Sequence, residues 1–146
     1  MRALLIGDLE VTRTTCALLT GRGVEVVHLL EPSDLELRTR LDATVDAVAV
    51  LVRSDVTALR YVLLVEQIRP GIRLVATVFD RTLAQRLRDV VPNCTVRSPA
   101  DIAVPSIAAA CLGGPALAVD LTGPEPRVLV RETDGELRFV PYHRSG

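Results

Sequence analysis

The chain has 146 residues, of which 49% are hydrophobic, and its formal net charge is -1. This length suits one domain with a genuine core, and the balanced charge excludes the basic surface typical of nucleic-acid binders. No apolar run approaches the roughly 18 residues of a membrane span, and no signal peptide is evident. We therefore expect a cytoplasmic protein without direct membrane insertion.

All 17 basic residues are arginine, which excludes Schiff-base chemistry by lysine and a Walker lysine. His28 lies on a predicted strand with no second metal ligand nearby, so we interpret it as a core or edge histidine. Cys16, Cys94 and Cys111 are far apart and odd in number, which favours buried free thiols over a disulfide framework or a zinc site. No group of residues brings a nucleophile, a base and an orienting group within reach, so we expect no catalytic residues and no metal.

Apolar runs alternate with helix-length segments through the first three quarters of the chain. In chain order they predict strand 2–6, a helix from the turn at Gly7 to Arg22, strand 25–30, helix 33–41, strand 45–52, helix 54–69, strand 73–78, helix 80–91, strand 94–97 and helix 99–112. Ser33, Ser54 or Asp55, and Asp80 are the expected helix caps, and Pro105 should kink the last helix or delay its start. This alternation predicts an α/β fold, a Rossmann-like doubly wound parallel sheet over residues 1–113.

The pattern changes after residue 113. Residues 116–121, 127–132 and 137–142 alternate as short strands, with a hairpin turn at 133–136. We expect residues 114–146 to form a small, β-rich antiparallel appendage at the C-terminus.

The loop that follows the first strand departs from a working phosphate loop. A dinucleotide-binding βαβ unit has three glycines there, and only Gly7 is present. Leu9 and Thr12 occupy the places of the other two glycines, while Asp8 and Glu10 put negative charge where a phosphate would lie. We predict weak or no binding of a pyrophosphate ligand.

The second and third strands contribute the remaining candidate residues. Glu31 comes one residue late for the acid that receives ribose hydroxyls, but it can serve if the chain turns there. Arg53 and Ser54 follow the central strand, where open α/β sheets place ligands; Arg53 either pairs with the acids of an empty site or contacts a bound anion. The candidate small-molecule site comprises Gly7, Asp8, Leu9, Glu10, Thr12, Glu31, Arg53 and Ser54.

Residues 1 to about 113 resemble the TrkA-N family, the N-terminal domain of regulators of potassium conductance (RCK). The likeness lies in the order and spacing of four segments: 4–7 with 21–27, 45–52, 54–71 and 77–99. The resemblance implies a domain that binds NAD(H) or an adenine nucleotide, forms homodimers and larger rings, and passes ligand-driven motion to a membrane pore.

One departure from the family changes the expected sheet. Residues 31–44 hold a single short helix where the family has room for helix, strand and helix, so one strand should be missing. We expect about five parallel strands in the order 2-1-3-4-5. The expected function is a non-catalytic regulatory or assembly domain of a potassium channel or transporter, tethered to the membrane through a partner or the rest of a longer chain. Bound cofactor is not expected; if there is one, it is NAD(H) or an adenine nucleotide.

Two alternatives stay open. The same strand order occurs in receiver domains of signalling proteins, whose acid pair Asp8 and Glu10 can imitate. Asp55 comes late for the receiver acid after the third strand, and the receiver lysine is absent. The other alternative is a TrkA-N domain that binds a different small ligand in a rebuilt site.

Overall fold

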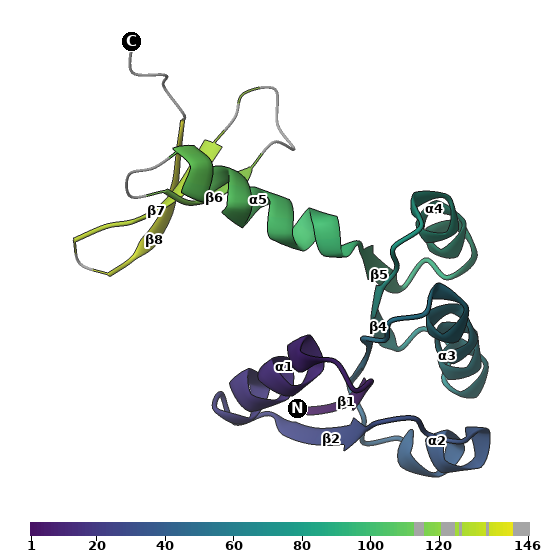
Figure 1. Ribbon diagram of the computed structural model, residues 1–146. Helices are drawn as coiled ribbons and strands as arrows, with labels where there is room; N and C mark the ends of the chain where they lie inside the picture. Colours follow the sequence, from purple (N-terminus) through teal and green to yellow (C-terminus); the bar gives the residue numbers. More distant parts are fainter. Residues whose placement is uncertain (113–115, 121–124, 126, 134, 142–146) are drawn as a thin grey trace. The chain divides into compact units, whose positions relative to one another are not determined.

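The computed structural model describes residues 1–112, 116–120, 125, 127–133 and 135–141. It divides into two compact units, Met1–Ser98 and Pro99–Gly146. The first unit holds helices α1–α4 and a parallel sheet, and the second holds helix α5 and an antiparallel sheet (Figure 1). The structure thus groups α5 with the C-terminal strands, whereas the sequence pattern grouped it with the parallel sheet. The expected boundary at residues 113 and 114 lies outside the described residues.

The first unit is built on a five-stranded parallel sheet with the strand order β2-β1-β3-β4-β5. The strands are β1 (Arg2–Ile6), β2 (Glu25–Leu29), β3 (Ala47–Val50), β4 (Arg73–Thr77) and β5 (Cys94–Arg97). This confirms the predicted α/β fold, its parallel sheet and its strand order. The predicted third strand was too long, since only four residues pair as β3.

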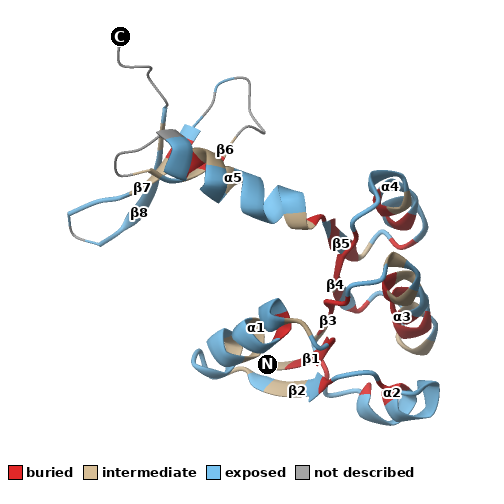
Figure 2. Ribbon diagram, viewed as in Figure 1, coloured by how far each residue is buried: buried red, intermediate tan, exposed pale blue. Residues whose placement is uncertain are grey.

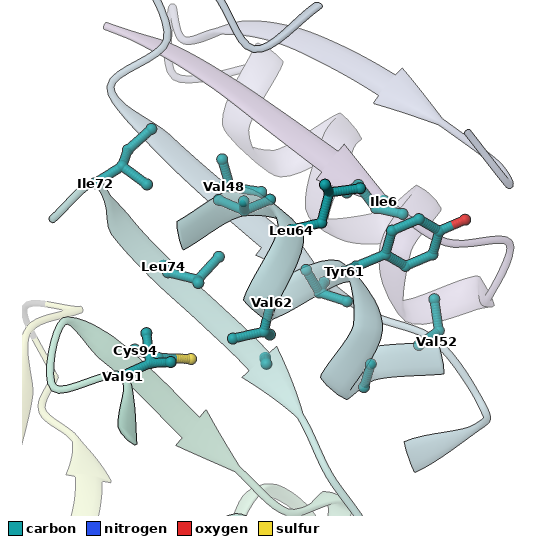
Figure 3. Packing of buried hydrophobic residues seen from close by; sticks show 14 of the residues in the cluster. Ile6, Val48, Val52, Tyr61, Val62, Leu64, Ile72, Leu74, Val91 and Cys94 are labelled. Carbon is teal, nitrogen blue, oxygen red and sulfur yellow. The ribbon is translucent and has the colours of Figure 1, made fainter. Parts of the chain in front are cut away.

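Helices cover the two faces of this sheet unequally. The helices are α1 (Glu10–Thr20), α2 (Asp34–Arg40), α3 (Asp55–Ile68) and α4 (Arg81–Val90). The larger core lies under α2, α3 and α4 and includes Leu37, Val62 and Leu87, whereas the opposite face buries a small cluster under α1 around Leu5. Figure 2 marks the buried segments, and Figure 3 shows part of the larger core, with Val62 among its labelled residues. The central strands β1 and β3 are apolar on both faces because helices cover both, whereas β5 alternates buried and exposed residues.

Side-chain caps fix where three of the helices begin. Ser33, Ser54 and Asp80 accept hydrogen bonds from backbone N–H groups in the first turns of α2, α3 and α4, which satisfies donors that the helix cannot pair. These caps were predicted, and Ser54 rather than Asp55 is the cap of α3. Helix α1 begins after Leu9 without a side-chain cap and ends at Thr20, two residues before the predicted end.

The second unit packs α5 (Pro99–Leu112) on a three-stranded antiparallel sheet of β6 (Ala116–Asp120), β7 (Arg127–Arg131) and β8 (Leu137–Pro141). Ala109, Val119 and Val128 form its buried centre. The antiparallel appendage was predicted, but Leu121 and Tyr142 at the predicted strand ends lie outside the described residues. Pro105 lies inside α5, which begins at Pro99, so this proline does not delay the start of the helix.

The prediction of three buried thiols was wrong for two of them. Cys94 is buried, Cys16 is half-buried and Cys111 is exposed, and all three are free. Cys111 lies on α5 within an alanine-rich stretch, and an apolar neighbourhood in sequence does not decide which face of a helix is covered. None of the helices in the described part of the chain combines the length and the apolar character that a bilayer crossing requires.

Candidate functional site

A cleft of about 540 Å³ opens at the carboxyl ends of β1, β2 and β3. Its position is the point where the strand order reverses, because β1 lies between β2 and β3 while the chain passes from β2 across β1 to β3. Open α/β sheets bind their ligands at this point. Its lining residues are Asp8, Leu30, Glu31, Pro32, Ser33, Val52, Arg53, Ser54, Thr57, Arg60 and Tyr61.

The structure brings four of the eight candidate residues to this cleft: Asp8, Glu31, Arg53 and Ser54. Gly7 and Thr12 are buried beside it, in the contact between α1 and β3. Leu9 and Glu10 lie at the start of α1 and do not line the cleft.

Gly7 and Thr12 hold the first helix against the sheet. Gly7 has a φ of +136°, and a Cβ at this position would lie 1.9 Å from the carbonyl oxygen of Leu51. Thr12 is fully buried, and its hydroxyl donates a hydrogen bond of 3.2 Å to the same oxygen. The side chain of Thr12 therefore fills the space that the third glycine leaves empty in a phosphate loop, and α1 packs on the sheet through this hydrogen bond.

The carboxylates near the start of α1 face solvent. Asp8 and Glu10 are both exposed, and Glu10 pairs with Arg13 on the same helix at 3.5 Å. The N-terminal end of a helix attracts anions through its free N–H groups and its dipole. Two flanking carboxylates oppose that attraction, so a pyrophosphate would meet negative charge at the place where the fold family binds it.

His28 supports the turn after β1. Its Nε2 lies 2.7 Å from the carbonyl oxygen of Gly7, and because a carbonyl only accepts, Nε2 carries the donated proton. The histidine lies on β2, at the edge of the sheet, and is exposed. It fits the predicted role of an edge histidine, and no group of three potential metal ligands exists within the described ranges.

The chain leaves the sheet at the end of β2, so Leu30 and Glu31 both follow the strand and line the cleft. Pro32 is anchored by Tyr61 of α3, whose hydroxyl donates to the Pro32 carbonyl oxygen at 3.1 Å. Burial raises the pKa of Tyr61, which keeps this donor protonated. The loop that carries Glu31 is thereby tied to α3.

Arg53, Ser54 and Thr57 come from the turn after β3 and the first turn of α3. The Ser54 hydroxyl accepts from the Thr57 N–H at 3.3 Å, so it is engaged as the cap. Arg53 is exposed and forms no ion pair within the described residues. The salt-bridged lid over an empty site, one of the two predicted roles of Arg53, is therefore absent from the structure.

Asp55 belongs to a different contact. Its two carboxylate oxygens accept hydrogen bonds of 2.8 Å from the backbone N–H groups of Phe79 and Asp80. These bonds join the start of α3 to the loop between β4 and α4. Asp55 does not line the cleft, so it does not stand where a receiver acid would act.

Arg60 closes the cleft on the α3 side. Its guanidinium forms an ion pair with Asp34 at the start of α2 and lies 5.1 Å from the ring centre of Tyr61. The Asp34 carboxylate raises the pKa of Arg60, which stays charged. Since Asp34 neutralises Arg60, the charged lining residues without an internal partner in the described structure are Asp8, Glu31 and Arg53.

The prediction from sequence missed seven lining residues: Leu30, Pro32, Ser33, Val52, Thr57, Arg60 and Tyr61. Helical spacing carried a signal for three of them. Positions 54, 57, 60 and 61 share one face of a helix that begins at 55, so a ligand placed at Ser54 implies contact with Thr57, Arg60 and Tyr61. Of the other four, Leu30, Pro32 and Ser33 lie in the loop after β2, whose path depends on the hydrogen bond from Tyr61, and Val52 follows β3.

Comparison of the chain with protein-family models, and with curated proteins, gives no match to either.

Proposed function

We propose that this chain is a non-catalytic regulatory or assembly domain of a potassium channel or other ion transporter, a domain of the TrkA-N type with weakened or lost nucleotide binding. The observation that carries the proposal is the cleft at the strand-order reversal, beside a first loop that lacks two phosphate-loop glycines. A cleft that keeps its position in the fold while its phosphate-loop glycines are replaced fits a regulatory domain better than an enzyme. The proposal places the domain in the cytoplasm, joined to its transporter through a partner or the rest of a longer chain.

The position of Asp55 supports this proposal over a receiver domain. A receiver needs a free acid at the end of the third strand, whereas both carboxylate oxygens of Asp55 are bonded to the Phe79 and Asp80 amides. The charged residue that directly follows β3 and lines the cleft is a cation, Arg53. A receiver site that carries an arginine in place of its acid would not accept a phosphoryl group.

The transport role is tested by rubidium uptake in source cells that lack this gene. Expression of the wild-type chain should restore the uptake of the parent cells. Arg86→Ala, an exposed change on α4 away from the cleft, should restore it equally, whereas Val48→Asp, which buries a charge in the sheet, should not. Identical rubidium uptake with and without the gene contradicts the proposal.

The weakened nucleotide site is tested by calorimetric titration with NAD, NADH, ATP, ADP and AMP. We expect no binding, or dissociation constants above the micromolar range, because Asp8 and Glu10 repel phosphate and Thr12 fills the loop. Micromolar binding of a pyrophosphate ligand contradicts this part of the proposal.

The proposal also includes a homodimer, supported by the surface of α5. Ile102, Val104 and Ile107 are at least half exposed on this helix, which is apolar almost throughout. Helices that are apolar on all sides are normally covered. Sedimentation velocity should show a dimer that Ile102→Asp with Ile107→Asp weakens, and a wild-type monomer at high concentration removes the dimer from the proposal.

A further inference from the structure

We propose that the cleft binds a basic amino acid, with the ligand's carboxylate at Arg53, its α-ammonium at Asp8 and its side-chain cation at Glu31. The inference rests on the proposed function, since it assigns a ligand to the regulatory cleft. The ligand is inferred from the residues that line the cleft, and it is not a nucleotide.

The charges that line the cleft select the ligand's charge. Arg60 is already neutralised by Asp34, so two carboxylates, Asp8 and Glu31, and one guanidinium, Arg53, remain without an internal partner in the described part of the chain. A ligand that balances them carries one anionic group and an excess of positive charge. Basic amino acids such as lysine, ornithine and arginine have this distribution of charge.

The strand order places these charges in a row. Glu31 follows β2, Asp8 follows β1 and Arg53 follows β3, and β1 is the strand between the other two. Neighbouring strands lie about 4.8 Å apart, so the ends of β2 and β3, which Glu31 and Arg53 follow, are separated by about 10 Å with the end of β1 between them. A ligand must therefore hold its anionic and cationic ends apart, as the extended side chain of a basic amino acid does.

The walls of the cleft suit the two parts of such a ligand. Leu30 and Val52 offer apolar surface to its methylene groups. Arg53 stands next to the first turn of α3, a 14-residue helix whose N-terminal dipole adds to the attraction for a carboxylate. A volume of about 540 Å³ is within the range of small-molecule sites.

Other ligand classes fit less well. Phosphates would face two carboxylates at Asp8 and Glu31 and only one free guanidinium. A divalent cation would need a set of three close ligands, and the described residues contain none. A neutral zwitterion balances Arg53 and one acid, and leaves the second acid without a counterion.

The test is calorimetric titration of the 146-residue chain with L-lysine. L-norleucine, which lacks the side-chain ammonium, and cadaverine, which lacks the carboxylate, are the matched ligands. We expect L-lysine to bind at least about tenfold more tightly than either, the ratio expected for loss of one charged contact. Equal affinities for all three ligands, or no binding of L-lysine, overturn the inference.

Substitutions assign the two ends of the ligand. Arg53→Ala should weaken L-lysine about tenfold or more and leave cadaverine unchanged or tighter, because only L-lysine offers a carboxylate. Asp8→Asn and Glu31→Gln should weaken both cations, and Arg86→Ala on α4 should weaken neither. A loss of affinity in Arg53→Ala that is the same for L-lysine and cadaverine overturns the proposed orientation.

The outcomes separate this inference from the proposed function. If rubidium uptake depends on the gene but no basic amino acid binds, the regulatory role stands and the ligand assignment is wrong. If L-lysine binds and rubidium uptake is independent of the gene, the ligand assignment stands and the transport role is wrong. Nucleotide binding that excludes L-lysine overturns both the ligand assignment and the weakened nucleotide site.

Discussion

Thr12 on α1 donates a hydrogen bond of 3.2 Å to the carbonyl oxygen of Leu51, the residue that follows β3. Thr12 is fully buried, and Leu51 is 7% exposed. The bond connects the first helix to the central strand at the place where glycines would let a helix approach a sheet and a phosphate approach the loop. The side chain at position 12 thus joins the first helix to the central strand at the place where a phosphate loop has its third glycine.

Thr12→Val should lower the free energy of unfolding by about 1–3 kcal/mol, because the isosteric change leaves the Leu51 carbonyl without this donor in a buried position. Urea denaturation measures the change. The matched control is Thr15→Val on the same helix, where the lost hydroxyl bonds the Val11 carbonyl oxygen at an exposed position; this variant should change stability by less than about 0.5 kcal/mol. Equal losses in the two variants would show that the contact with Leu51 contributes nothing specific.

Asp55→Asn should lower the free energy of unfolding by about 1.5–3 kcal/mol, the range for hydrogen bonds to a charged group. The carboxylate accepts from both the Phe79 and the Asp80 N–H groups, and an amide group presents only one acceptor to them. Asp89→Asn on α4, where the carboxylate meets only the Gln85 amide, is the control and should be nearly neutral. The prediction fails if urea denaturation gives the two variants the same stability.

Much of the fold, and less of the cleft, follows from the sequence. Apolar runs bounded by Ser33, Ser54 and Asp80 predict the strands and helix starts because periodicity and caps are local properties. The charge pairing in the cleft is not local. Arg60 reaches Asp34 across 26 positions, and nothing in the spacing of the sequence distinguishes it from Arg53, which forms no such pair.

The grouping of α5 was missed for a related reason. Its apolar residues suit a contact with either sheet, and the composition of a helix does not identify the sheet it packs on. Ala109 lies in a cluster with Val119 and Val128 of the antiparallel sheet, so contacts between residues that are distant in sequence decide which sheet α5 packs on.

The position of Glu31 is a similar case, because the loop that carries it is held by the hydrogen bond from Tyr61 to Pro32.

Stability should fall in alkaline solution through Cys94. Burial, with a smaller contribution from the charge of Glu66, raises the pKa of this thiol from 9.0 to about 11. The folded state holds the proton more tightly than the unfolded state, so this stabilisation is complete below pH 9 and is lost as the pH rises to about 11. The loss is at most about 3 kcal/mol, from about 1.4 kcal/mol per pKa unit.

Thermal unfolding measured from pH 8 to pH 11 tests this dependence. Cys94→Ala should be less stable at pH 8 because it leaves a small cavity, but its stability should decline less steeply above pH 9. Cys111→Ala, which removes an exposed thiol, should keep the wild-type slope. Tyr61 also has a raised pKa, so part of the alkaline decline should remain in every variant, and an unchanged slope in Cys94→Ala would contradict the assignment to this thiol.

Glycines at positions 8 and 9 should not restore nucleotide binding while Glu10 remains. In Asp8→Gly with Leu9→Gly, the backbone is free to approach a pyrophosphate, but Glu10 still places a carboxylate in the first turn of α1, paired only with the exposed Arg13. Calorimetry with NAD and ADP should therefore show no gain for the double variant and a measurable gain once Glu10→Gln is added. Recovered affinity in the double variant alone would mean that the side chains at positions 8 and 9, and not the charge of Glu10, keep phosphate out.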